Sequence, residues 1–138
     1  VMRSTDGGAS FSALESPYKG SFFGLLRGVG SPSDTGDVWV AYGLRGTAYR
    51  SSDAGGHWRK LDTGVPMAVG AGMALPTGGF VLMSQAGDAL VGRDDSIALR
   101  RVVAREPVPV SGVALAEDGS LVVASLRGMR RLPALSAN

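Results

Sequence analysis

The apolar positions of this chain fall into short runs, and polar turns that contain glycine separate one run from the next. Three similar turns recur at 41-residue intervals, at residues 43–46, 84–87 and 125–128. Each turn follows one apolar run and precedes a second, shorter one. The alternation within runs such as 37–42 is typical of strands that are buried on both faces. The pattern predicts strands rather than helices.

The repeat divides into units of four expected strands. The first full unit, residues 21–62, has strand patterns at 21–26, 37–42, 47–51 and 58–61. The second, residues 67–103, has them at 71–75, 79–84, 88–92 and 98–103. A third, residues 108–133, has three, at 111–116, 120–125 and 129–132, and residues 1–14 hold the end of an earlier unit, with strands at 2–4 and 11–14.

A period of about 40–45 residues built of short strands is that of a β-propeller blade. We therefore predict one all-β domain over residues 1–138, made of propeller-type four-stranded antiparallel blades. It would hold two full and two partial blades, an incomplete ring. The alternative is a meander sandwich whose strands are merely regularly spaced. The composition agrees with many tight turns, because 21 residues are glycine.

The most specific local motif is Ser-Ser-Asp-Ala-Gly-Gly-His-Trp at residues 51–58, which has the Asp-box pattern Ser-x-Asp-x-Gly-x-x-Trp. A second copy, at residues 4–11, ends in phenylalanine. A short carboxylate can accept hydrogen bonds from the N–H groups of its own turn, glycine supplies a positive φ, and the aromatic ring packs between strands. The motif predicts a structural hairpin turn, with these key residues: Ser4, Asp6, Gly8, Phe11, Ser51, Asp53, Gly55, Gly56 and Trp58.

Residues 37–58 resemble the blade pattern of the photosystem II stability and assembly factor family. The matching residues are Gly43, Gly46, Ser51, Asp53, Gly56 and Trp58. The resemblance is good over residues 1–62 and fades over 63–138. It implies a propeller, usually of seven blades, that serves as a non-enzymatic scaffold or assembly factor outside the cytoplasm, in the periplasm or secreted.

Sialidases also carry Asp-boxes, so a sialidase-like glycoside hydrolase or a glycan-binding propeller is the alternative function. Resemblance to sialidases would require three arginines, a Tyr–Glu pair and an acidic aspartate. Tyr42 and Tyr49 lie inside expected strands, and no Arg-Ile-Pro-like segment precedes the first box. His57 is the only histidine, and it lies in an expected turn. We therefore predict that the chain is not an enzyme.

The charge and the composition limit the classes of partner that the chain could bind. The net charge is only +2, and no clustered basic stripe of the kind that binds nucleic acid is present. The chain has no cysteine, and Asp94 and Asp95 have no further carboxylates at metal-ligand spacing, so we expect neither a metal nor a cofactor. The equivalent turns and a strand end would place three arginines at one rim, where they could bind an acidic protein: Arg45, Arg127 and Arg27.

An incomplete ring would expose the apolar faces of its end blades. Two explanations remain open. Either the chain is part of a longer propeller, or two copies form a homodimer that completes a ring of about six blades.

Overall fold

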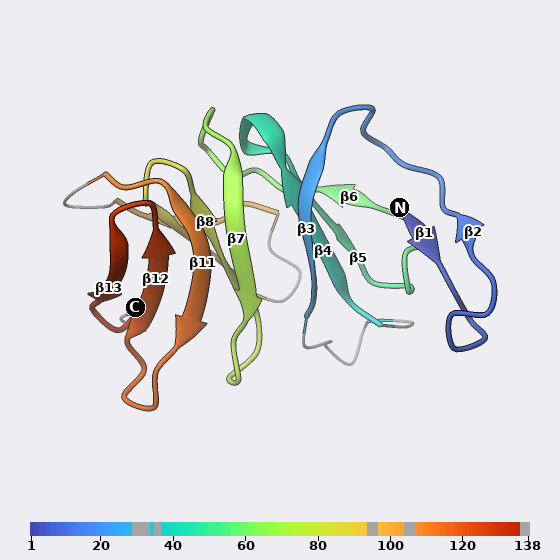
Figure 1. The fold of residues 1–138 in the computed structure, drawn as a ribbon. Helices are drawn as coiled ribbons and strands as arrows, with labels where there is room; N and C mark the ends of the chain where they lie inside the picture. The colour runs from blue at the N-terminus through green and yellow to red at the C-terminus, as the bar shows by residue number, and fades with distance from the viewer. Residues whose placement is uncertain (29–33, 35–36, 94–96, 104–106, 136–138) are drawn as a thin grey trace.

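The computed structural model describes residues 1–28, 34, 37–93, 97–103 and 107–135. Asp94 and Asp95, and most of the loop at residues 28–36, lie outside the described residues. The described chain is all-β apart from one short 3-10 turn, and its strands form antiparallel sheets of two, three or four strands that stand in a row (Figure 1). The predicted all-β fold is therefore confirmed.

The sheets follow the order of the sequence. The N-terminal hairpin consists of β1 (Met2–Arg3) and β2 (Ser12–Ala13). The first full sheet holds β3 (Phe22–Arg27), β4 (Trp39–Gly43), β5 (Ala48–Ser51) and β6 (Arg59–Lys60), with the 3-10 turn η1 (Leu44–Gly46) between β4 and β5. The second full sheet holds β7 (Val69–Ala74), β8 (Phe80–Ser84), β9 (Ala89–Gly92) and β10 (Arg100–Val102). The third sheet holds β11 (Val110–Leu115), β12 (Leu121–Ser125) and β13 (Gly128–Leu132).

The sheets pack face to face because successive side chains along a strand point alternately into two apolar interfaces. In β8, Phe80 and Leu82 belong to the core between the first and second full sheets, whereas Val81 and Met83 belong to the core between the second and third. All four side chains are buried. A strand that is apolar on both faces needs a sheet on each side, and this explains the row.

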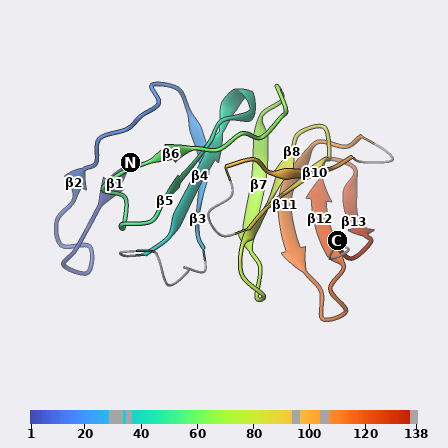
Figure 2. The same cartoon turned by 180° about the vertical axis from the view of Figure 1, so that it is seen from behind.

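The innermost strands of neighbouring sheets, β3, β7 and β11, lie side by side (Figures 1 and 2). Two glycines in β7 allow this approach. A Cβ on Gly72 would lie 2.7 Å from a methyl carbon of Leu82 and 3.0 Å from one of Leu26. A Cβ on Gly70 would lie within 2.3 Å of the carbonyl oxygen of Val110. Glycine is therefore required where the sheets converge.

The third sheet departs from the 41-residue period by one residue. Met83 pairs with Ala89 in the second full sheet, but the equivalent Ala124 pairs with Met129 rather than Arg130. Gly128, with φ of 93°, closes this tighter turn. A one-residue change of register moves every side chain to the other face of the strand. Arg130 and Leu132 therefore face the second full sheet, and Met129 is exposed.

Among the residues that the structure describes, no helix has the length and apolar character needed to span a bilayer. The N-terminal hairpin and the third sheet stand at opposite ends of the row (Figure 2). The blade boundaries predicted from the sequence, 1–14, 21–62, 67–103 and 108–133, remain predictions.

Candidate functional site

The Asp-box at residues 51–58 forms a turn held by its own side chains. The Ser51 hydroxyl donates to Oδ1 of Asp53 over 2.9 Å and accepts a hydrogen bond from the Gly55 N–H over 2.8 Å. Oδ1 of Asp53 also accepts from the His57 N–H over 2.8 Å. These bonds satisfy N–H groups that a tight turn would otherwise leave unpaired.

The box at residues 4–11 repeats the same bonds. Ser4 donates to Oδ1 of Asp6 over 2.7 Å and accepts from the Gly8 N–H over 2.8 Å. Asp6 accepts from the backbone N–H and the hydroxyl of Ser10, over 2.9 Å and 2.5 Å. The two boxes also share a glycine with a positive φ, Gly8 and Gly55, so the common serine, aspartate and glycine positions together determine the geometry.

The glycine positions of the second box have different roles. Gly55 adopts a φ of 88°, which glycine reaches without steric cost, and the preceding Ala54 also has a positive φ of 57°. Gly56 does not have a positive φ; a Cβ there would lie 2.9 Å from Oδ2 of Asp53. Gly56 therefore makes room for the carboxylate.

The two aromatic residues of the boxes differ in burial. Trp58 is half-buried and lines a cavity of about 510 Å³ between the first full sheet and the N-terminal hairpin, together with Leu14 and Leu25. Its Nε1 is buried and has no hydrogen-bond partner among the described residues. Phe11 is 61% exposed, contrary to the expected packing between strands, because its hairpin has only two strands.

Hydrogen bonds to the charged carboxylates lower the pKa of both aspartates. The backbone N–H of His57, followed by its ring, lowers the pKa of Asp53 to about 2. The Ser10 hydroxyl and then the Ser10 N–H lower the pKa of Asp6 below its ordinary range.

We expect the Asp53 turn to weaken in acid. Because its folded pKa of about 2 lies below the ordinary value of 3.8, the unfolded state binds more protons between these values. The stabilisation is complete above pH 4 and declines as the pH falls towards 2. Solvent screening at this part-exposed turn limits the loss in Asp53→Asn to about 1 kcal/mol at pH 7.

Urea unfolding at several pH values would measure this effect. The stability difference between wild type and Asp53→Asn should shrink as the pH falls from 4 to 2. A difference that does not depend on pH would contradict the assignment of these bonds to the charged carboxylate.

Ser51, Asp53 and His57 do not form a catalytic triad. Nδ1 of His57 lies 2.6 Å from Oδ2 of Asp53, and the His57 side chain is 95% exposed. Ser51 contacts the same carboxylate from the other side and is 1% exposed. A nucleophilic serine must contact the histidine, which is absent from this arrangement. Within the described ranges, no group of three potential metal ligands occurs either.

The structure separates the three arginines predicted for one rim. Arg45 lies in η1, between β4 and β5, and Arg127 lies in the equivalent turn between β12 and β13. Arg27 was placed wrongly. Arg27 pairs with Trp39, at the end of the strands opposite to η1, because antiparallel strands run in opposite directions. There Arg27 forms an ion pair of 2.6 Å with Asp37.

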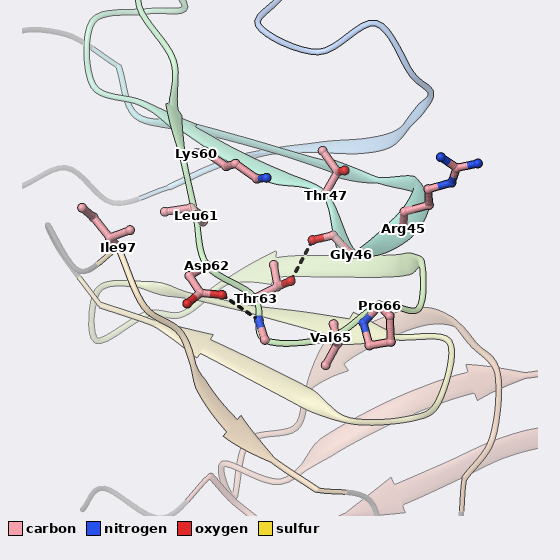
Figure 3. A pocket seen from close by; sticks show the side chains of 11 residues that line it. Arg45, Gly46, Thr47, Lys60, Leu61, Asp62, Thr63, Val65, Pro66 and Ile97 are labelled. Atoms are coloured by element: carbon pink, nitrogen blue, oxygen red, sulfur yellow. Dashed lines mark hydrogen bonds between the residues drawn. The ribbon is translucent and has the colours of Figure 1, made fainter.

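A groove of about 550 Å³ opens beside Arg45 (Figure 3). Lys60, at the end of β6, and residues 61–66 of the link from β6 to β7 also line it. The Thr63 hydroxyl donates to the Gly46 carbonyl oxygen over 2.8 Å, and the Gly64 N–H donates to Oδ1 of Asp62 over 3.1 Å. The Thr63 bond holds the link against η1, and the Gly64 bond fixes the turn within the link, so the groove has a fixed floor.

Two cations stand on the walls of this groove. Arg45 and Lys60 form no ion pair with any residue in the described ranges, whereas the Asp62 carboxylate accepts a backbone hydrogen bond. Arg45 has φ of 57° and ψ of 40°, a left-handed conformation that is unfavourable for a residue with a Cβ. Such strain is often found at functional sites. Lys60 was not predicted from the sequence. It is the last residue of β6, and β6 ends at the same rim of the sheet as the η1 turn.

Comparison with known proteins supports the fold. No protein-family model matches the chain, and no curated protein sequence matches it. A solved structure described as YCF48 bound to D1 peptide matches with a TM-score of 0.58 and 19% sequence identity. The match covers 90% of this chain and 39% of that one. The chain therefore has the fold of a segment of the YCF48 propeller, in agreement with the resemblance in the sequence.

Proposed function

We propose that the chain is a non-catalytic binding module that holds an acidic segment of another protein in the groove between η1 and residues 60–66. The observation that supports this proposal best is the pair of cations, Arg45 and Lys60, that line one groove with a fixed floor. Carboxylates are the groups that such cations attract, and arginine can bind them through two hydrogen bonds.

The comparison adds a second reason. The YCF48 structure was solved with a D1 peptide, so a protein of this fold binds a peptide. We extend this property to the present chain as a scaffold or assembly-factor function, and from the family resemblance we propose that it acts outside the cytoplasm. Pro66 and Ile97 add apolar surface beside the cations, which suits a peptide with mixed side chains.

Arg45→Gly tests the groove without risk to the fold. Glycine adopts the left-handed conformation at position 45 freely, so the variant should be at least as stable as the wild type. Its affinity for a short fluorescein-labelled, glutamate-rich peptide should fall about fivefold, or about 1 kcal/mol, at low salt. Lys60→Gln should have a similar effect. Fluorescence anisotropy would measure both.

Arg27→Gln is the matched control, because it removes the same charge at the opposite edge. Its affinity should equal that of the wild type, and the glutamine version of the peptide should bind weakly to every variant. Equal losses in Arg27→Gln and Arg45→Gly would show that only net charge matters, and the groove would then be excluded as the site.

A further inference from the structure

Lys60 in the first full sheet and Arg101 in the second occupy equivalent positions, 41 residues apart. The strand pairing agrees with this equivalence, because Lys60 pairs with Tyr49 in β5 and Arg101 pairs with Leu90 in β9, again 41 residues apart. Each cation therefore stands on the fourth strand of its sheet, in the same register with the third strand. The two cations differ in what lies beside them.

In the second full sheet, Arg101 has a carboxylate partner from its own chain. Asp88 lies two residues before Leu90, so it is a diagonal neighbour of Arg101 on the same face of the sheet. Its Oδ2 accepts hydrogen bonds from Nε of Arg101 over 2.9 Å and from a terminal guanidinium nitrogen over 2.6 Å. The Asp88 side chain is 4% exposed. This sheet therefore neutralises its cation with a buried carboxylate.

In the first full sheet the same diagonal position is threonine. Thr47 lies 41 residues before Asp88 and two residues before Tyr49, and it lines the groove together with Lys60. Figure 3 shows the Lys60 side chain extending from β6 towards Thr47. A hydroxyl carries no charge, so it cannot neutralise the ammonium group. Lys60 accordingly has no ion pair within the described ranges.

The Thr47 hydroxyl is a second donor without a partner. The residue is 8% exposed, and a hydroxyl buried to this extent normally forms a hydrogen bond. Its backbone N–H donates to the Leu44 carbonyl oxygen over 3.1 Å, but its Oγ1 forms no hydrogen bond with another residue in the described part of the chain. The groove therefore presents an ammonium group and a hydroxyl whose partners the described chain does not supply.

We propose that one aspartate or glutamate side chain of the bound peptide occupies the position beside Lys60 that the Asp88 carboxylate occupies beside Arg101. The peptide carboxylate pairs with the Lys60 ammonium group and accepts a hydrogen bond from the Thr47 hydroxyl. This inference rests on the proposed binding of an acidic segment in the groove, and it adds Thr47 as a binding residue. The second full sheet has no such site, because Asp88 already fills the position.

The two donors favour a carboxylate over an amide. Both oxygens of a carboxylate only accept hydrogen bonds, so one group can serve the ammonium of Lys60 and the hydroxyl of Thr47 together. A glutamine side chain offers one acceptor and an NH₂ group, and it carries no charge to pair with Lys60. The chain itself uses a carboxylate at the equivalent position of the second full sheet.

Thr47→Asp tests the inference, because it gives the first full sheet the carboxylate that the second already has. The introduced carboxylate should pair with Lys60 and exclude the peptide carboxylate. Fluorescence anisotropy with the labelled glutamate-rich peptide should show a loss of affinity of at least about tenfold. Thr47→Asn is the matched control, since it has the same shape without the charge and can still donate a hydrogen bond. Its affinity should stay within about threefold of the wild type.

Two further measurements isolate the contact. Arg27→Gln lowers the net charge by the same one unit as Thr47→Asp and should bind as the wild type does. Without peptide, NMR titration of Thr47→Asp should give the introduced carboxyl group a pKa about one unit lower than in Thr47→Asp with Lys60→Gln, because a nearby cation favours the charged carboxylate. This second readout does not depend on peptide binding.

The outcomes separate this inference from the proposed function. A wild type that does not bind the peptide would exclude the proposed function, and the inference with it. A wild type whose affinity falls in Arg45→Gly and Lys60→Gln, but equally in Thr47→Asp and Thr47→Asn, would leave the proposed function intact and overturn the inference. A pKa at position 47 that is the same with and without Lys60 would also overturn it.

Discussion

Replacing Gly46 with alanine should lower the free energy of unfolding by about 3 to 4 kcal/mol. Gly46 has a φ of 67°, and a Cβ there would lie within 1.9 Å of the carbonyl oxygen of Val65. Backbone atoms on both sides are fixed, since the Gly46 carbonyl accepts the Thr63 hydrogen bond. Alanine therefore introduces backbone strain and forces the link away from η1.

Gly64→Ala separates these two causes. Gly64 lies in the same link and has a φ of 63°, but a Cβ there would meet no atom within 4 Å. The free energy of unfolding of this variant should fall only by the cost of the left-handed backbone conformation, about 1 kcal/mol. Urea unfolding of both variants gives the comparison. Equal losses would mean that the link is not held against η1, and the groove would have no fixed floor.

Leu82→Ala should destabilise the chain by about 2 to 5 kcal/mol. Leu82 lies on the middle strand β8, is fully buried, and packs in the core between the two full sheets. The surrounding strands have little room to collapse into the space, because the sheets are already close here: a Cβ on Gly72 would lie 3.0 Å from a methyl carbon of Leu26. The whole chain should therefore unfold with its midpoint at a lower urea concentration.

Leu126→Ala is the control for the same chemical change. Leu126 lies in the turn before β13 and is 95% exposed, so its replacement should change stability by less than about 0.5 kcal/mol. If both leucine variants lost similar stability, the interface between the full sheets would not be the core described above.

The strands could be predicted because each carries a strong local signal. Alternation at residues 37–42 and 79–84 and glycine turns at a fixed interval predicted β4 and β8 to within two residues at each end. The one-residue shift of β13 could not be predicted, because it depends on how tightly one turn closes. Gly128 is a turn glycine in either register, and only the pairing of Met129 with Ala124 decides between them.

The candidate site was predicted only in part. Arg45 and Arg127 follow directly from the repeat, since equivalent turns lie at the same edge. Arg27 was assigned by its closeness to a strand end, without regard to the direction of that strand. Lys60 and residues 61–66 of the link line the groove only after packing, and Phe11 is exposed because sheet completeness, not the motif, controls its burial.

The central claim is that this chain is a row of sheets stacked through their innermost strands. Nuclear Overhauser effects in a labelled sample test it most directly. Stacked sheets predict contacts from Gly72 in β7 to the methyl groups of Leu26 in β3, and from Gly70 in β7 to Val110 in β11. If both contacts are absent while the antiparallel pairings within each sheet are present, the sheets do not stack in this order and the propeller fold is wrong.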